Sequence, residues 1–334
     1  MKIAVDAMGG DHAPSVVVEG AIAAAGENQI PVILVGHKET IQNELAHHRH
    51  VHLPIEVVHA SEHVGMDESP IAPLRQKTDC SIRVAIDLVQ KGDAQAIVSA
   101  GNTGAVMATA KVILGTIKGV ERPGIAAILP SLKGKSLLLD VGANVDCKPV
   151  HLLQFAIMGD VYAQEVMGIK NPAVGLLNIG EERIKGNELT KETFPLLEKA
   201  ALNFIGNVEG RDIYNGKADV IVCDGFIGNI GLKISEGVAD IITRLMKKEI
   251  KSNPVSHAAA IFIKPAFKRL KKMIDYSEYG GAPLLGVNAT CIICHGSSNA
   301  RAIQNGIRVA AEATKHKVHQ QISENILKSK VING

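Results

Sequence analysis

The sequence predicts an α/β protein with a doubly wound, mostly parallel sheet, Rossmann-like in carrying helices on both faces of the sheet. Short, almost continuously apolar segments alternate with longer helix-like segments along the chain. Turns rich in glycine and polar residues follow the apolar segments. No linker, low-complexity tract or short repeat divides the 334 residues. We therefore expect one α/β domain over 1–334, either undivided or split into two lobes by a cleft.

The expected elements follow one another as strand, turn and helix. The strands are predicted at 2–8, 31–35, 55–59, 96–100, 124–129, 135–141, 173–179, 218–223 and 289–294. The helices are predicted at 14–25, 38–48, 74–91, 103–114, 150–167, 188–201, 228–251 and from 299 onward. Pro14 suits the first turn of its helix, where a backbone N–H is not needed. The loop 61–73 is long enough to indicate a function, and 130–134 fits a hairpin turn.

Composition excludes several classes of protein. Hydrophobic residues make up 46% and charged residues 21%, with a net charge of +2, so the chain is typical of a soluble globular protein. The absence of Trp and an aromatic content of 3% argue against base stacking, and we expect no nucleic-acid partner. Five scattered cysteines fit a reducing compartment. Asp6 interrupts any signal-peptide core, and no apolar run approaches the roughly 18 residues of a spanning helix, so we expect a cytoplasmic protein.

Six of the predicted strands are followed by turns that combine Gly with Asn, Asp, Ser or His. These turns lie at 6–11, 99–104, 140–144, 178–182, 223–229 and 294–299. Open α/β sheets bind ligands outside the carboxyl ends of their strands. One such turn is ordinary, but six of them predict a functional cleft along one edge of the sheet.

The turn at 99–104 is the best candidate for an anion site. It joins a buried strand to a helix of small and apolar residues. Backbone N–H groups at the positive end of that helix, two hydroxyls and an amide are the donors that phosphate needs. The predicted phosphate-binding residues are Ser99, Gly101, Asn102, Thr103 and Gly104.

Several better-known motifs are incomplete. A phosphate-binding Walker loop ending at Gly134-Lys135-Ser136 would need glycine where Leu129 stands. The glycines at 225, 228 and 231 do not have dinucleotide-fingerprint spacing. Cys291 and Cys294 face opposite sides of a strand, so they indicate core packing and no zinc site. The histidines at 47, 48, 50 and 52 fit a solvated loop. We expect no metal and no cofactor.

The six turns, with Lys-Gly-Asn-Glu at 185–188, resemble the motifs of the bacterial phosphate acyltransferase (PlsX) family. The resemblance runs from Met1 to about Arg308, with every block in order. It implies transfer of a fatty acyl group from acyl carrier protein (ACP) to inorganic phosphate. The acyl phosphate then feeds a glycerol-3-phosphate acyltransferase in phospholipid synthesis. The resemblance also implies a homodimer and a fold similar to those of phosphotransacetylases and isocitrate dehydrogenases. Asn299 departs from the family's usual Asp and is given no role.

The chemistry of such a transfer fits the polar residues of the turns. Orthophosphate is already an anion, and no nucleophile–base pair stands out in the sequence, so direct attack on the thioester is the simplest mechanism. Asn144, Asn229 and His295 are candidate donors to the oxyanion, and Lys185 is a candidate for neutralising phosphate. His295 alternatively protonates the leaving thiolate. Three carboxylates, which would repel phosphate, are predicted to orient or cap the turns: Asp11, Asp140 and Asp224.

Two other functions remain open from the sequence. An NAD-dependent decarboxylating dehydrogenase shares the architecture, but neither a metal-binding Asp cluster nor an Arg-rich clamp is evident. A non-catalytic scaffold at a lipid surface is the other alternative, and it predicts that substitutions in the cleft leave function intact.

The segment 254–274 differs from the α/β pattern. An apolar stretch is followed closely by cations, and Pro265 divides the segment into two short helices or a helical hairpin. Apolar residues backed by cations suit an anionic membrane surface, so we expect peripheral contact with the inner face of the cell membrane. Docking of acidic ACP and packing across a dimer are the alternatives. The residues expected to make the contact are Ile261, Phe262, Lys264, Phe267, Lys268 and Arg269.

Overall fold

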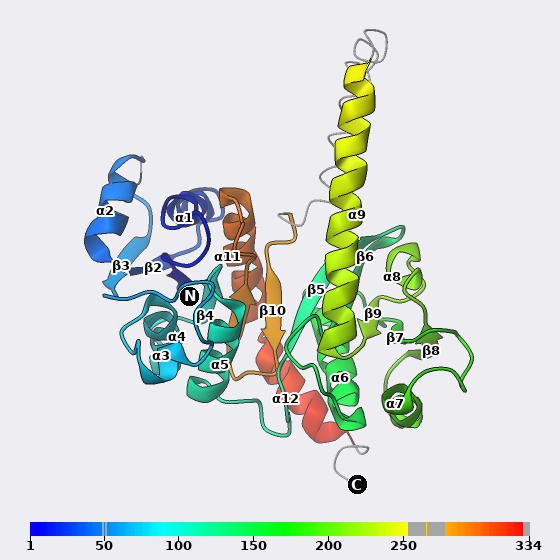
Figure 1. Cartoon of the computed structure of the whole chain (residues 1–334). Helices are drawn as coiled ribbons and strands as arrows, with labels where there is room; N and C mark the ends of the chain where they lie inside the picture. Colours follow the sequence, from blue (N-terminus) through cyan, green and yellow to red (C-terminus); the bar gives the residue numbers. More distant parts are fainter. Residues whose placement is uncertain (49, 51, 253–264, 266–277, 330–334) are drawn as a thin grey trace.

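The computed structural model describes residues 1–48, 50, 52–252, 265 and 278–329. Within them, one sheet has the strand order β3-β2-β1-β4-β11-β10-β5-β6-β9-β7-β8 (Figure 1). The strands are β1 (Ile3–Asp6), β2 (Val32–Gly36), β3 (Ile55–His59), β4 (Ala96–Ser99), β5 (Gly124–Ser131), β6 (Gly134–Leu139), β7 (Val174–Leu177), β8 (Phe204–Val208), β9 (Val220–Val222), β10 (Ala282–Leu285) and β11 (Thr290–Ile293). The predicted α/β class is confirmed.

Helices cover both faces of this sheet. They are α1 (Ser15–Glu27), α2 (Lys38–Ala46), α3 (Ala72–Arg75), α4 (Ser81–Lys91), α5 (Thr103–Ile113), α6 (Pro149–Glu165), α7 (Glu188–Lys199), α8 (Asp212–Asn215), α9 (Gly225–Ser252), α11 (Ala300–Lys315) and α12 (Val318–Lys328). Successive side chains of β1 point to opposite faces of the sheet, and each face is covered by its own layer of helices. Ile3 and Val5 belong to a core with residues of α1 and α11, whereas Ala4 belongs to a core with residues of α4 and α5 on the opposite face.

The sheet consists of two parallel blocks that run in opposite directions. β1, β2, β3, β4 and β11 are parallel to one another, and so are β6, β7, β8 and β9. Between the blocks, β10 is antiparallel to both β11 and β5, and β5 forms an antiparallel hairpin with β6. Three reversals leave the blocks antiparallel. The expectation that all six polar turns share one edge is therefore wrong: they form two clusters, one for each block.

Several elements differ from their predicted bounds. The predicted helix 74–91 is divided into α3 and α4, and β8 and β10 were not expected from the sequence. The 130–134 hairpin turn is confirmed between β5 and β6. Cys291 and Cys294 are both buried and belong to different cores, which confirms the packing interpretation. The segment 254–274 lies outside the described residues apart from Pro265.

Helix α9 is unlike the other long helices. It has 28 residues, of which only Gly225 and Gly228 are buried, and it extends away from the rest of the protein (Figure 1). Among the described residues, no helix is both long enough and apolar enough to cross a membrane.

Candidate functional site

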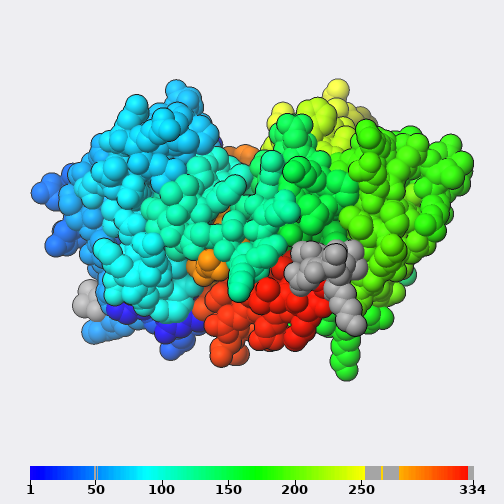
Figure 2. Space-filling model, turned by 90° about the horizontal axis from the view of Figure 1, so that it is seen from below, coloured from blue at the N-terminus to red at the C-terminus, as the bar shows by residue number. Residues whose placement is uncertain are grey.

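The surface is hollowed between two lobes. Figure 2 shows the hollow between a lobe coloured blue to cyan and a lobe coloured green to yellow. The polar turns of the first block belong to elements of the first lobe and to β11, and those of the second block belong to elements of the second lobe.

The first cluster is built on the buried carboxylate of Asp6, at the end of β1. Ser99, at the end of β4, donates a hydrogen bond from Oγ to Asp6 Oδ2 (2.7 Å). The same Ser99 oxygen accepts the N–H of Gly101 (3.0 Å). A Cβ on Gly9 would lie 2.4 Å from Asp6 Oδ2, so only glycine fits beside the carboxylate. Asp6 therefore fixes the turn that leads into α5.

The first turn of α5 leaves donors open to a ligand. Asn102 is the N-cap, and its Oδ1 accepts the N–H of Ala105 (3.0 Å). Within the described part of the chain, no acceptor is hydrogen-bonded to the N–H groups of Thr103 and Gly104 or to the Thr103 hydroxyl. Free N–H groups at the positive end of a helix form an anion site.

The other predicted phosphate ligands have different partners. The Asn102 side chain donates to the carbonyl oxygens of Gly65 (3.3 Å), Met66 (3.1 Å) and Glu68 (3.0 Å). The Ser99 hydroxyl and the Gly101 N–H are used within the turn. The prediction that these three residues contact phosphate directly does not match these hydrogen bonds. They shape the site, while Thr103 and Gly104 offer its open donors.

His295 lies in the turn after β11, beside the same site. Its Nδ1 lies 2.8 Å from Ser297 Oγ and accepts the Ser297 N–H at 3.2 Å. The Asp11 N–H donates to the carbonyl of Gly296 (2.8 Å), which joins the turn after β1 to this turn. Asn299 is the N-cap of α11. Asp11, His295 and the Ser99–Gly104 turn are thus brought together, because β1 and β11 are both neighbours of β4.

The second cluster is built on Asp140, which is fully buried after β6. Its Oδ1 accepts the N–H groups of Ile125, Gly142 and Ala143 at 3.0–3.2 Å. Its Oδ2 accepts the Asn144 N–H (2.7 Å) and the Asn144 amide (2.9 Å). Burial raises the pKa of Asp140, and these hydrogen bonds oppose that rise. The expected orienting role of Asp140 is consistent with these contacts.

The same contacts occupy the Asn144 amide. Besides Asp140, its Nδ2 donates to the carbonyl of Pro123 (2.7 Å), and the residue is 8% exposed. Both amide protons are thus directed into the protein. The expectation that Asn144 donates to an oxyanion does not agree with this geometry, which makes Asn144 a support for the turn.

The N-terminus of α9 adjoins the Asp140 turn. Asp224 Oδ1 accepts the N–H groups of Phe226 (3.0 Å) and Ile227 (2.9 Å), as expected of a capping carboxylate. Asn229 is exposed, and its side chain lies 3.6 Å from the Cβ position of Gly142. Of the two oxyanion donors predicted in this cluster, Asn144 and Asn229, it is Asn229 whose side chain faces solvent.

Lys185 lies in the loop after β7, which is held at several points. Asn178 Nδ2 donates to the Lys185 carbonyl (3.2 Å), and Asn207 donates to the Glu182 carbonyl (2.9 Å). Lys217 forms an ion pair with Glu181 (2.8 Å). Lys185 is exposed, and no described residue pairs with its ammonium group. The loop is thus held in place, and the Lys185 ammonium group on it is exposed to solvent.

No described thiol has the low pKa of a nucleophilic cysteine. Burial, assisted by the charge of Asp140, raises the pKa of Cys147 to about 11. Burial raises the pKa of Cys291 and Cys294 to about 12. In the residues that the structure describes, no three His, Cys, Asp or Glu side chains cluster as metal ligands do. Sequence reasoning missed Asp6, although it begins the same motif as Asp11. It singled out the loop 61–73 by its length but gave none of its residues a role.

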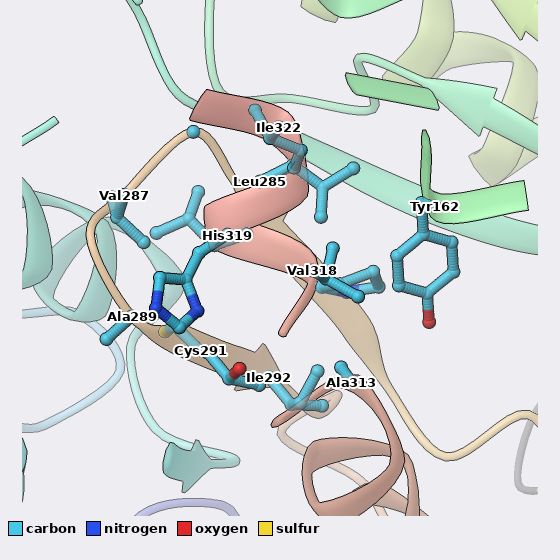
Figure 3. A pocket seen from close by; sticks show the side chains of 14 residues that line it. Tyr162, Leu285, Val287, Ala289, Cys291, Ile292, Ala313, Val318, His319 and Ile322 are labelled. Carbon is cyan, nitrogen blue, oxygen red and sulfur yellow. The ribbon is translucent and has the colours of Figure 1, made fainter. Parts of the chain in front are cut away.

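A small cavity of about 20 Å³ lies away from both clusters. Figure 3 shows Tyr162 of α6 and His319 of α12 among its lining residues, which are otherwise mostly apolar. The Tyr162 hydroxyl and His319 Nδ1 are buried without a hydrogen-bond partner. This cavity is too small for an acyl group or phosphate.

Comparison with known proteins identifies the relatives of the chain. A family model described as "Fatty acid synthesis protein" matches residues 1–321. A phosphate acyltransferase from Geobacter sulfurreducens is 53% identical over 326 residues, covering 98% of this chain and 94% of that protein. A phosphate acyltransferase from Desulfitobacterium hafniense is 54% identical over 327 residues, covering 98% of each.

Solved structures with this fold are more distant in sequence. A phosphotransacetylase from Streptococcus pyogenes has a TM-score of 0.64 at 18% identity, with 94% of each chain covered. The EutD phosphotransacetylase from Staphylococcus aureus has a TM-score of 0.61 at 16% identity, also with 94% of each chain covered. These two comparisons concern the fold alone.

An α/β sheet of this topology, a helix terminus with open backbone donors and relatives at this identity define the chain as an acyltransferase that uses phosphate. Its family is the bacterial phosphate acyltransferase (PlsX) family, to which it belongs over nearly its whole length. The resemblance drawn from the six turns is confirmed.

Proposed function

We propose that the protein transfers a fatty acyl group from acyl-ACP to inorganic phosphate, releasing acyl phosphate and free ACP. The observation that carries the proposal is the first turn of α5. There, the N–H groups of Thr103 and Gly104 and the Thr103 hydroxyl have no partner among the described residues. His295 and Asp11 flank this turn. Phosphate bound there lies at the positive end of a helix, held by neutral donors.

The reaction then needs placement more than activation. A phosphate oxygen attacks the thioester carbonyl carbon, the carbonyl oxygen becomes an oxyanion, and the C–S bond breaks to release the ACP thiolate. Correct placement of the two reactants contributes up to roughly 7–11 kcal/mol. Each donor to the oxyanion contributes about 2.7–4 kcal/mol. His295 belongs to the same cluster as the α5 terminus, and we assign it the role of oxyanion donor, with protonation of the thiolate as the alternative. Asn229 and Lys185 belong to the second cluster, and we propose that they supply a second donor and neutralise phosphate where the two clusters face each other across the hollow.

Thr103→Val tests the phosphate site. The substitution removes one open hydroxyl and keeps the side-chain shape, so we expect the KM for phosphate to rise about tenfold, with a smaller change in the KM for acyl-ACP. Thr109→Val is the matched control on the same helix, because the Thr109 hydroxyl is buried without a partner. An unchanged phosphate KM in Thr103→Val would contradict this placement.

The proposed transfer is direct and requires no metal. Treatment with a chelator is expected to leave the initial rate unchanged. Mass spectrometry during turnover is expected to detect only unmodified enzyme. An acyl-cysteine or acyl-serine adduct that forms and decays at the turnover rate would replace direct attack by a two-step mechanism.

We further propose that two copies pair through α9. Six apolar side chains recur every three or four residues along the helix and are 43–61% exposed: Ile227, Ile230, Ile234, Val238, Ile241 and Leu245. An apolar stripe of this length on a projecting helix is stabilised when a second helix covers it. Ile234→Glu with Ile241→Glu is expected to give a monomer by light scattering, whereas Lys233→Glu leaves the dimer intact. A dimeric double variant would contradict this interface.

The segment 254–274 joins an apolar stretch to a run of cations. We propose that this segment contacts the inner face of the cell membrane, near the acceptor acyltransferase that consumes acyl phosphate. Ile261→Glu with Phe262→Glu is expected to abolish binding to anionic vesicles while acyl transfer in solution and the dimer mass persist. Retained vesicle binding would exclude the membrane role, and loss of the dimer would favour packing between copies.

A further inference from the structure

A loop crosses the first turn of α5 and is held there by one side chain. Asn102 Nδ2 donates to the carbonyl oxygens of Gly65, Met66 and Glu68, at 3.0–3.3 Å. Its Oδ1 caps α5 at the same time. Since Asn102 is only 8% exposed, these bonds are shielded from water. One residue thus joins the 65–70 loop to the helix terminus that offers the anion site.

The loop is also fixed on its other side. Lys77 forms an ion pair with Glu68 (2.6 Å) and donates to the His63 carbonyl (2.8 Å). Glu68 in turn accepts the N–H of Gly65 (3.2 Å). The loop therefore has a defined conformation against α5, which is required if it contacts a substrate.

Two residues of the loop lie directly against the site. A Cβ on Gly104 would lie 2.9 Å from the Pro70 ring, so Pro70 packs over the second residue of α5. A Cβ on Gly296 would lie 2.8 Å from the Met66 methyl group, so Met66 reaches the turn that carries His295. Met66 is 48% exposed. A large apolar side chain thus stands open to solvent between the α5 terminus and the His295 turn.

We propose that Asn102 is a positioning residue that holds the 65–70 loop as a wall of the site, where Met66 contacts the fatty acyl chain of the donor. This rests on the proposed function. When phosphate is bound at Thr103 and Gly104, the reacting carbonyl carbon lies about 3–3.5 Å from a phosphate oxygen. The fatty acyl chain extends from that carbon past the polar turns. Met66 supplies apolar surface at this point. Methionine is flexible and polarisable, which suits contact with alkyl chains.

Asn102→Ser tests the positioning role. Serine keeps an oxygen that can cap α5 but is too short to reach the three carbonyls. We expect hydrogen exchange at the amides of residues 65–68 to accelerate at least about tenfold, and the KM for hexadecanoyl-ACP to rise about tenfold, with a smaller rise in the phosphate KM. A variant with unchanged exchange in the loop, or with a rise confined to the phosphate KM, would overturn the proposal.

Met66→Ala tests the contact with the chain independently of Asn102. We expect kcat/KM for hexadecanoyl-ACP to fall about tenfold and that for butanoyl-ACP to change little, because only the longer chain extends past the loop. Val112→Ala, at an exposed apolar position near the other end of α5, is the control. Equal loss with both donors, or no loss with either, would overturn the role of Met66. Wild-type protein that forms no acyl phosphate from either donor would instead overturn the proposed function.

Discussion

The side-chain carboxylate of Asp140 accepts two hydrogen bonds from Asn144, one from its backbone N–H (2.7 Å) and one from its amide (2.9 Å). This relationship changes the interpretation of Asn144. An asparagine in a polar turn of an acyltransferase has the chemistry of an oxyanion donor, but here its amide closes the turn around a buried carboxylate.

Asn144→Ala is therefore expected to act on stability. Loss of the amide leaves part of the Asp140 carboxylate and the Pro123 carbonyl without donors, which costs about 1–3 kcal/mol. Thermal unfolding is expected to show a lower Tm, and turnover measured well below that Tm is expected to change less than with Asn229→Ala. A fall in kcat with an unchanged Tm would restore Asn144 as a catalytic donor.

Asp6 is expected to give a specific pH dependence of stability. Burial raises the pKa of Asp6 above its ordinary value of 3.8, and hydrogen bonds from Ser81, Ser99 and Met8 oppose that rise. The folded state therefore binds a proton on Asp6 more tightly than the unfolded state does. The stability that this proton contributes is fully present below the unfolded pKa and is lost as pH rises through the folded pKa. Asparagine does not titrate, so Asp6→Asn is expected to gain Tm relative to wild type as pH rises from about 4. A constant Tm difference up to about pH 8 would contradict this.

Gly228 is expected to tolerate no side chain. A Cβ at this position would lie 1.8 Å from the Asp140 carbonyl oxygen, so Gly228→Ala must displace α9 or the Asp140 turn. We expect a loss of about 3 kcal/mol in unfolding free energy. Gly231→Ala, one turn further along α9, has no atom within 4 Å of its Cβ and is expected to gain up to about 1 kcal/mol from helix propensity. Equal stabilities of the two variants in urea would contradict the close approach of α9.

Tyr162→Phe is expected to stabilise the protein slightly. Tyr162 is fully buried and its hydroxyl has no hydrogen-bond partner, so removing the hydroxyl relieves a desolvation cost of about 1 kcal/mol. Tyr214→Phe is the control, since the Tyr214 hydroxyl is hydrogen-bonded to Ser235 and its loss is destabilising. A clear loss of stability in Tyr162→Phe would show that a polar partner, such as a water in the cavity of Figure 3, occupies that position.

The sequence by itself determined the local elements and the residues of the turns. Apolar segments such as 96–99 and 220–222 are buried on both faces, which a strand between two helical layers requires, and that composition is visible without coordinates. The caps are likewise local: Asn102, Asp224 and Asn299 each bond to an N–H two or three residues ahead. The motifs in their order were also sufficient to indicate the family, because they span nearly the whole chain.

Only the tertiary structure decided which turns meet and which polar groups remain open. The direction of each block depends on the pairing of β10 with β5, between residues far apart in the chain, and no local pattern encodes that pairing. The carbonyls that accept from the Asn102 amide lie 34–37 residues away, and the carboxylate that accepts from the Ser99 hydroxyl lies 93 residues away. A donor hydrogen is open to a ligand only if no protein acceptor takes it, and that is decided by the tertiary packing around Asp6 and Asp140.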